Sequence, residues 1–294
     1  MVGMRVRLVR DPWWAAAAAC FVAFAVGSAA GCEAGRAASD PAAVSAPASA
    51  RADGTVRVLQ MNLCNSGRAD CYSGGRAISR AAALIHEHRP DLVSLNEICH
   101  DDLAVLEKAM STTLATGSVA SAFGRVNDRD TGAPVRCRNG EDFGDGVLVV
   151  VPPTVVSRTF SGANPVQNPR DPEQRVWVCV DVPTRFAGCT THSTSRDTTT
   201  ALEQCRQLLG TVIPGLGRPD GLGPLILGAD LNLPARGPNG PDACLPGGYH
   251  RADDGGLQDV VVGPGLGLRS RSVIDMQGTT DHPGLLVDVA LPRG

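Results

Sequence analysis

The stretch that most constrains the fold is Pro224 to Asn232, which reads Pro-Leu-Ile-Leu-Gly-Ala-Asp-Leu-Asn. Its short apolar run lies between Gly223 and Pro234, and these boundaries predict a strand that is buried on both faces. Alternation along an extended chain then points Asp230 and Asn232 to the same side. Because α/β sheets bind ligands beyond the carboxyl ends of their strands, this carboxylate and amide favour ligand chemistry. An Asx-type turn that only ends the strand is the structural alternative.

The composition is that of a globular protein and argues against one mode of nucleic-acid binding. With 43% hydrophobic and 19% charged residues, the chain of 294 residues could hold one large domain or two small ones. The formal net charge of -3 argues against binding of nucleic acid through bulk positive potential. Binding through a local cluster of arginines remains open. Lys108 is the only lysine, so nearly all the positive charge is arginine.

The N-terminus is typical of a signal peptide. Three arginines up to Arg10 precede an uncharged apolar run from Trp13 to Ala30, as in the charged and hydrophobic regions of an export signal. The run is alanine-rich and barely long enough to span a bilayer, which disfavours a permanent transmembrane helix. It ends in Ala29-Ala30-Gly31-Cys32, which resembles a bacterial lipoprotein cleavage box with Cys32 as the lipidation candidate. Simple secretion, with cleavage at a site such as Ala48-Ser49-Ala50, is the alternative.

This pattern predicts an exported protein that is either extracellular or attached to the outer face of the cell membrane through lipidated Cys32. Residues 1–32 would be the signal peptide, of lipoprotein type or secretory type. Residues 33–53 are rich in Ala, Pro and Ser without a hydrophobic period, and we expect a flexible linker there. Residues 54–294 form the predicted functional domain, which we expect to be a monomer.

The cysteine count supports export. Apart from Cys20 and Cys32, eight cysteines remain, an even number in a chain bound for an oxidising compartment. No Cys-x-x-Cys pair occurs, which disfavours zinc ribbons and thioredoxin-like redox sites. We expect the local pairs Cys64 with Cys71 and Cys179 with Cys189, and the remaining connectivity is open. The disulfide candidates are Cys64, Cys71, Cys99, Cys137, Cys179, Cys189, Cys205 and Cys244.

Apolar runs and helical periods alternate along the domain. The sequence predicts strands at 55–62, 91–95, 146–151, 175–182, 186–191, 224–230, 258–262 and 284–291. It predicts helices at 74–89, 101–114 and 198–212, the first of which ends before Pro90. A long polar loop region is expected from 121 to 145, and a Gly/Pro-rich loop from 236 to 248.

Polar residues of a few types stand where these apolar runs end or begin. They are Asn62, Glu97, His192, Asp230 with Asn232, and Asp281-His282. Carboxylates from Glu97 and Asp281, with the amide oxygen of Asn62, would suit a hard cation such as Mg²⁺. The cation and the two imidazoles would neutralise charge around a phosphoryl group in its transition state. Asp230, held by Asn232, would orient or deprotonate the attacking water.

The ordered set of motifs resembles that of the endonuclease/exonuclease/phosphatase superfamily, which includes pancreatic-type deoxyribonuclease, inositol-polyphosphate phosphatases and neutral sphingomyelinases. The matching pieces are Met61-Asn62, Leu95-Asn96-Glu97, Thr191-His192-Ser193, Gly228-Ala229-Asp230-Leu231-Asn232, Leu257-Gln258-Asp259-Val260 and Thr280-Asp281-His282. They span essentially the whole domain. The resemblance implies an α/β fold, a two-sheet sandwich with flanking helices as in deoxyribonuclease.

The resemblance also implies a role for each matched residue. Glu97 corresponds to the main metal ligand, with Asn62 and Asp281 as its partners, and His192 to the histidine that contacts the scissile phosphate. Asp230 and Asn232 correspond to the pair that positions the nucleophilic water. His282 corresponds to the catalytic histidine, Asp259 to the aspartate that orients it, and Arg175 to an arginine near the phosphate.

We therefore expect an exported magnesium-dependent phosphoesterase that hydrolyses phosphodiester bonds, with nucleic acid as the favoured substrate. Mn²⁺ and Ca²⁺ are the alternative cofactors. A phosphatase or a sphingomyelinase-like lipid phosphodiesterase with the same chemistry remains open, as does a non-catalytic binding module at the cell surface. The complete set of polar residues disfavours the binding module.

Overall fold

The apolar runs of the sequence become strands of two mixed sheets. The computed structural model describes residues 54–183, 185–216 and 221–292. The expected signal peptide, its Cys32 and the linker to residue 53 lie outside the described residues. The strands are β1 (Thr55–Asn62), β2 (Leu92–Cys99), β3 (Ser118–Arg125), β4 (Phe143–Val151), β5 (Arg158–Ala163), β6 (Val176–Val182), β7 (Phe186–His192), β8 (Leu225–Asp230), β9 (His250–Asp253), β10 (Gln258–Val262), β11 (Gly267–Ile274) and β12 (Gly284–Ala290).

Each sheet is built around one parallel pair of strands. The strand order is β11-β12-β1-β2-β4-β3 in the first sheet and β5-β6-β7-β8-β10-β9 in the second. β1 and β2 are parallel, as are β7 and β8, and the other described pairs are antiparallel. Parallel neighbours need a long crossover. The crossovers contain α1 (Arg76–His88) in the first sheet and α3 (Thr198–Gln207) in the second.

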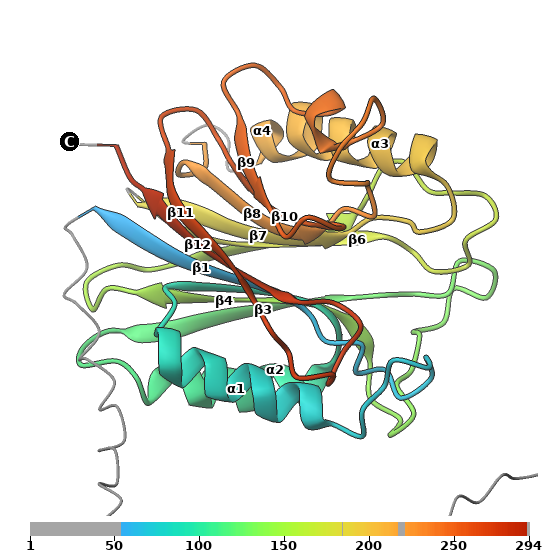
Figure 1. Ribbon diagram of the computed structural model, residues 1–294, viewed down its shortest axis with the longest axis horizontal. Helices are drawn as coiled ribbons and strands as arrows, with labels where there is room; N and C mark the ends of the chain where they lie inside the picture. The colour runs from blue at the N-terminus through green and yellow to red at the C-terminus, as the bar shows by residue number, and fades with distance from the viewer. Residues whose placement is uncertain (1–53, 184, 217–220, 293–294) are drawn as a thin grey trace, which may run out of the picture. The chain divides into compact units, whose positions relative to one another are not determined.

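The two sheets pack face to face, with helices on their outer faces (Figure 1). Val58 and Val260 belong to the apolar core between the sheets. A second core lies beneath α1 and α2 (His100–Ser111), and a third lies beneath α3, the π-helix Leu208–Val212 and α4 (Ile213–Gly215). A 3₁₀ turn, Pro241–Ala243, follows β8. The two-sheet α/β sandwich predicted from the sequence is confirmed. None of the helices in the described residues is long and apolar enough to cross a membrane.

The strands that the sequence pattern missed are the four edge strands of the two sheets. β3 and the start of β4 lie where a loop was expected between residues 121 and 145, and β5, β9 and β11 were not predicted. An edge strand has one unpaired side and carries more polar and exposed side chains than a central one. In β11, for example, five consecutive residues from Arg269 to Val273 are exposed. Such strands lack the continuous apolar run on which the expectation depended.

The eight cysteines of the domain form four disulfides. Cys64–Cys71 and Cys179–Cys189 are the two local pairs expected from the sequence. The other two are long-range, Cys99–Cys137 and Cys205–Cys244. Cys99–Cys137 ties the end of β2 to the loop that precedes β4, and Cys205–Cys244 ties α3 to the loop after β8.

Candidate active site

The carboxyl ends of the two parallel strand pairs bring the polar residues together. In the first sheet Asn62 lies beside Asn96, and in the second His192 lies beside Asp230. The two ends meet across the sandwich, where the Asn62 Nδ2 atom donates to Asp230 Oδ2 at 3.0 Å. Polar residues from four strands that are distant in sequence therefore meet at one end of the sandwich.

A β-bulge directs Glu97 into this site. Leu95 pairs with Gly146 and Ile98 with Gly144, so Asn96 and Glu97 together stand opposite Asp145 alone. Glu97 adopts a left-handed backbone with φ of 56°. Bulges near active sites redirect a side chain, and a non-glycine residue in this conformation costs about 1–3 kcal/mol. The surrounding structure tolerates this strain at the residue that the sequence assigns to the metal.

A buried polar network supports the bulge from below. Asn96 donates to Asp145 Oδ1 at 3.0 Å and accepts from the backbone N–H of Asp230 at 3.0 Å. Gly228 makes room for this network, because a Cβ there would lie 1.8 Å from the Ser94 hydroxyl. The network fixes the backbone of Asp230 relative to β2, and thus relative to Glu97.

Asn62 holds the two central carboxylates at one place. Its Nδ2 donates to Glu97 Oε1 at 2.9 Å as well as to Asp230. Its Oδ1 accepts from the backbone N–H of Cys64 at 3.1 Å. Asn62 therefore lies beside Glu97, as expected of a partner of the main metal ligand. Its NH₂ group faces the two carboxylates, and its oxygen accepts one backbone hydrogen bond. Asn62 orients the ligands.

The charge of this pair fits a divalent cation. Burial raises the pKa of Glu97, and the nearby Asp230 and Asp281 raise it further. Burial also raises the pKa of Asp230. Within the described residues, neither Glu97 nor Asp230 forms an ion pair with an Arg or Lys. The half-buried Glu97 and the buried Asp230, without such a partner and with the Asp281 carboxylate near, offer the oxygen ligands that Mg²⁺ prefers.

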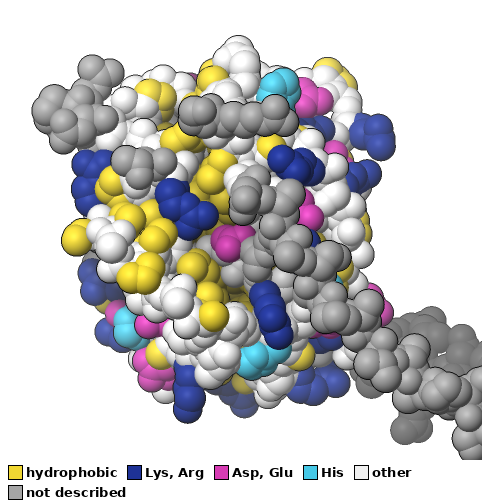
Figure 2. Space-filling model, turned by 90° about the vertical axis from the view of Figure 1, so that its left-hand side faces the viewer, with side chains coloured by type: hydrophobic (Ala, Val, Ile, Leu, Met, Phe, Trp, Pro, Cys, Tyr) yellow, Lys and Arg dark blue, Asp and Glu magenta, His cyan; other side chains and the backbone are white. Residues whose placement is uncertain are grey.

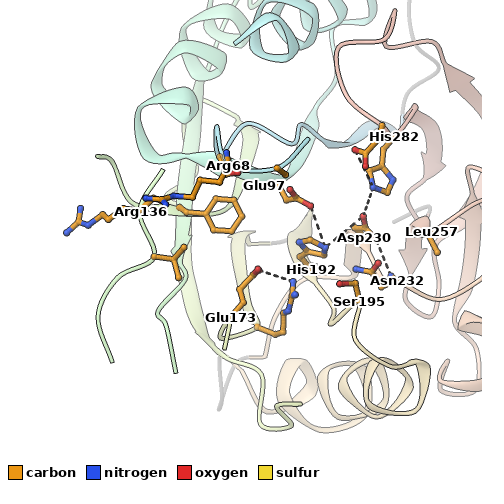
Figure 3. Close-up of a pocket in the computed structure, with 16 residues that line it drawn as sticks. Arg68, Glu97, Arg136, Glu173, His192, Ser195, Asp230, Asn232, Leu257 and His282 are labelled. Atoms are coloured by element: carbon orange, nitrogen blue, oxygen red, sulfur yellow. Dashed lines mark hydrogen bonds and ion pairs between the residues drawn. The ribbon is translucent and has the colours of Figure 1, made fainter. Parts of the chain in front are cut away.

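Two imidazoles flank the carboxylate pair (Figure 3). His192 Nε2 lies 4.0 Å from Glu97 Oε1 and 4.0 Å from Asp230 Oδ2. Burial, and then the positive charge of Arg175, hold the pKa of His192 well below its ordinary value, so this ring is neutral at pH 7. His282 Nε2 lies 3.5 Å from Asp230 Oδ2. Both histidines that the sequence predicted for the site therefore lie within 4.0 Å of a carboxylate oxygen of a predicted acid.

Asn232 and Arg175 also line the cavity, each held by other groups. Asn232 has φ of 51°, its backbone N–H donates to Asp230 Oδ1 at 3.1 Å, and its Nδ2 donates to the carbonyl of Ser193 at 2.8 Å. Arg175 donates through Nε and Nη2 to Asp171 and forms an ion pair through Nη1 with Glu173 at 2.9 Å. The Arg175 guanidinium is therefore balanced by two carboxylates of the chain.

Asp259 does not lie in the site, which corrects the role inferred for it. In β10, Gln258 pairs with Asp230 and faces the space between the sheets, so Asp259 faces the opposite side. Its carboxylate accepts from Arg251 Nη1 at 2.7 Å. Gln258 instead accepts from the backbone N–H of Asn62 at 2.9 Å and donates to the carbonyl of Pro283, the residue after His282. Gln258 therefore connects the backbone beside His282 to β1.

The site lies in a cavity of about 580 Å³. This volume is within the range of small-molecule sites. Three charged side chains that line the cavity were not among the predicted site residues: Arg68, Glu173 and Arg136. Glu173 precedes Arg175 by two residues, and this spacing was a usable signal because extended chain points both side chains the same way. Nothing local marks Arg68, whereas Arg136 belongs to the arginine-containing polar loop expected from 121 to 145; both reach the cavity from loops.

The structure resembles solved structures of low sequence identity. A structure described as endonuclease/exonuclease/phosphatase from Beutenbergia cavernae DSM 12333 has a TM-score of 0.59 at 20% identity, and the match covers 81% of this chain and 72% of that chain. D. rerio TDP2 complexed with single strand DNA product has a TM-score of 0.55 at 15% identity, covering 81% and 99%. The mannosyl-6-phosphatase of Bacteroides thetaiotaomicron VPI-5482 has a TM-score of 0.54 at 15% identity, covering 80% and 100%.

The sequence itself gives the family. No curated protein matches it. The profile of the endonuclease/exonuclease/phosphatase family matches residues 64–294, which is most of the chain and includes every site residue except Asn62. On this match the chain belongs to the endonuclease/exonuclease/phosphatase family, whose members are metal-dependent phosphoric ester hydrolases.

Proposed function

We propose that this protein is an exported, magnesium-dependent phosphodiesterase that cleaves nucleic acid. The observation that carries the proposal is the arrangement of Glu97 and Asp230. Both carboxylates are bridged by the Asn62 amide, and His192 Nε2 lies 4.0 Å from each. Acids and neutral imidazole in one cavity suit a tetrahedral anion that is bound together with a cation.

Glu97 would hold the cation, with Asp281 beside it. When bound, Mg²⁺ would supply Lewis-acid chemistry by polarising a phosphoryl oxygen and balancing the charge of the transition state. Burial makes this binding favourable, because the cation replaces water around carboxylates that the fold has partly desolvated.

The remaining side chains would carry out the proton and positioning steps. Asp230 accepts a proton from the attacking water, and its raised pKa makes it a stronger base than an exposed aspartate. Asn62 and Asn232 fix the two oxygens of that carboxylate. His192, as a neutral ring, donates one N–H to a phosphate oxygen. His282 lies on the other side of Asp230 and donates to the departing or equatorial oxygen.

Export is part of the proposal because of the cysteines. Four disulfides in one domain are typical of proteins that fold in an oxidising compartment. This supports the signal peptide expected from residues 1–32.

A substrate panel tests the proposed activity. Purified protein is incubated with DNA, RNA, a lipid phosphodiester and p-nitrophenyl phosphate, in Mg²⁺ and in EDTA, beside the Asp230→Asn variant. We expect DNA or RNA to be cleaved in Mg²⁺ only, and not by the variant. Hydrolysis of p-nitrophenyl phosphate alone would instead favour a phosphatase, the activity named for the Bacteroides thetaiotaomicron structure. If none of the four substrates is hydrolysed, the proposal that the protein is a phosphodiesterase is refuted.

A further inference from the structure

The cavity extends well beyond the carboxylates and histidines. Besides these groups it is lined by Arg68, Val135, Arg136 and Phe143. Arg68 and Arg136 lie at one side of the cavity and His282 at the other, with Glu97 and His192 between them (Figure 3). One end of the cavity is therefore rich in carboxylates, and the other end carries guanidinium groups above an apolar wall.

Two disulfides and two hydrogen bonds fix the loops that carry these arginines. Arg68 lies in the loop that Cys64–Cys71 closes, and Arg136 precedes Cys137, which is bonded to Cys99. The loops contact each other directly, because the Arg138 backbone N–H donates to the Ser66 carbonyl at 2.8 Å. Arg68 Nε donates to the Arg136 carbonyl at 2.7 Å. Such anchoring lowers the entropy that Arg68 would lose on binding a ligand.

The charges in this cavity single out Arg68. Arg175 is balanced by Asp171 and Glu173, and Arg136 forms an ion pair with Asp142 at 2.8 Å. Among the guanidinium groups that line this cavity in the described part of the chain, Arg68 is the one without a carboxylate partner. Its Nε is bonded to a neutral carbonyl, which leaves Nη1 and Nη2 for a ligand.

Positive side chains do not gather into one patch on the face that Figure 2 shows. The face at the left of Figure 1 carries Lys and Arg side chains that lie scattered among hydrophobic, acidic and other groups (Figure 2). The formal net charge of -3 likewise gives no general attraction for a polyanion. A single oriented guanidinium in a cavity recognises one phosphate by geometry, because its planar fork matches two phosphate oxygens.

We propose that Arg68 forms a second anion subsite, which binds a phosphate group of the substrate next to the one that is hydrolysed. The inference rests on the proposed function. It narrows the substrate class to nucleic-acid strands, or other phosphate esters, that carry a further phosphate within reach of Arg68.

Three dinucleotides test the subsite. TpT has one diester and no other phosphate, whereas pTpT and TpTp add a terminal phosphate on one side or the other. We expect one of the two phosphorylated forms to be cleaved with kcat/KM at least about tenfold above that of TpT, the effect of one charged hydrogen-bonding pair. Arg68→Ala should abolish this preference and leave the rate on TpT within about threefold. Arg68→Lys, which keeps the charge without the fork, should retain part of the preference.

Arg138→Ala is the matched control, since Arg138 lies in the contacting loop but does not line the cavity. It should keep the preference. The subsite is refuted if Arg68→Ala lowers all three rates equally, if the preference survives in that variant, or if the parent shows none. If the protein cleaves DNA or RNA in Mg²⁺ but none of the dinucleotides, the subsite proposal fails, and if it cleaves none of these substrates, the nuclease proposal itself fails. Release of the terminal phosphate from pTpT or TpTp without diester cleavage would identify a phosphatase and refute both.

Discussion

Replacing Asp145 with asparagine tests how burial sets the charge beneath the active site. Asp145 is 3% exposed, it accepts from Asn96 Nδ2, and no Lys or Arg of the described residues forms an ion pair with it. Burial raises the pKa of this carboxyl to about 7. The folded protein therefore binds this proton more tightly than the unfolded chain, whose aspartates have a pKa of about 3.9.

The size of the effect follows from these two values. The folded-state pKa lies above the unfolded value. Asp145 therefore leaves the free energy of unfolding unchanged below about pH 4 and lowers it increasingly as the pH rises to about 7. The full difference of about three pKa units corresponds to roughly 4 kcal/mol in the free energy of unfolding, of which about 3 kcal/mol develops between pH 5 and pH 9. Asparagine stays neutral at every pH. It has one acceptor oxygen where aspartate has two, so it loses one of the hydrogen bonds that Asp145 accepts from Asn96 and from the Glu97 backbone, worth about 1 kcal/mol.

Guanidinium chloride unfolding of Asp145→Asn and the parent, in EDTA at pH 5 and pH 9, measures this difference. We expect the stability of the variant relative to the parent to rise by about 3 kcal/mol between the two pH values. Asp101→Asn, which removes an exposed charge at the start of α2, controls for net charge and should show no comparable change. A difference for Asp145→Asn that is the same at both pH values would refute the argument that burial raises this pKa.

Three further outcomes follow from the site and the disulfides. Asp230→Asn and His282→Ala should lower kcat by about 10²–10⁴-fold with an unchanged circular dichroism spectrum, as loss of proton transfer does. Asp259→Asn should leave kcat/KM within about threefold, because its carboxylate contacts Arg251; a loss of 100-fold on cleavage of DNA would restore it as the partner of His282. Mass spectrometry after thiol labelling in denaturant should find no free thiol among the eight cysteines of the domain.

The sequence predicted the central strands well because their signal is local. Residues 55–62, 224–230 and 258–262 are apolar runs of the length of a buried strand, and the structure places β1, β8 and β10 there. The edge strands β3, β5, β9 and β11 were missed because one side of each is unpaired and their residues are mixed in polarity.

The sequence by itself determined which polar residues end the central strands, because an apolar run and the residue after it are neighbours along the chain. Tertiary structure alone decided which way these side chains face. Asp259 points away from His282 because the register of β10 with β8 places Gln258, and not Asp259, opposite Asp230. Glu97 enters the site through a bulge that forms only against β4, and Arg68 reaches it through loop contacts between segments about 70 residues apart. Register, bulges and loop contacts depend on partners distant in sequence, so the local pattern of residues does not encode them.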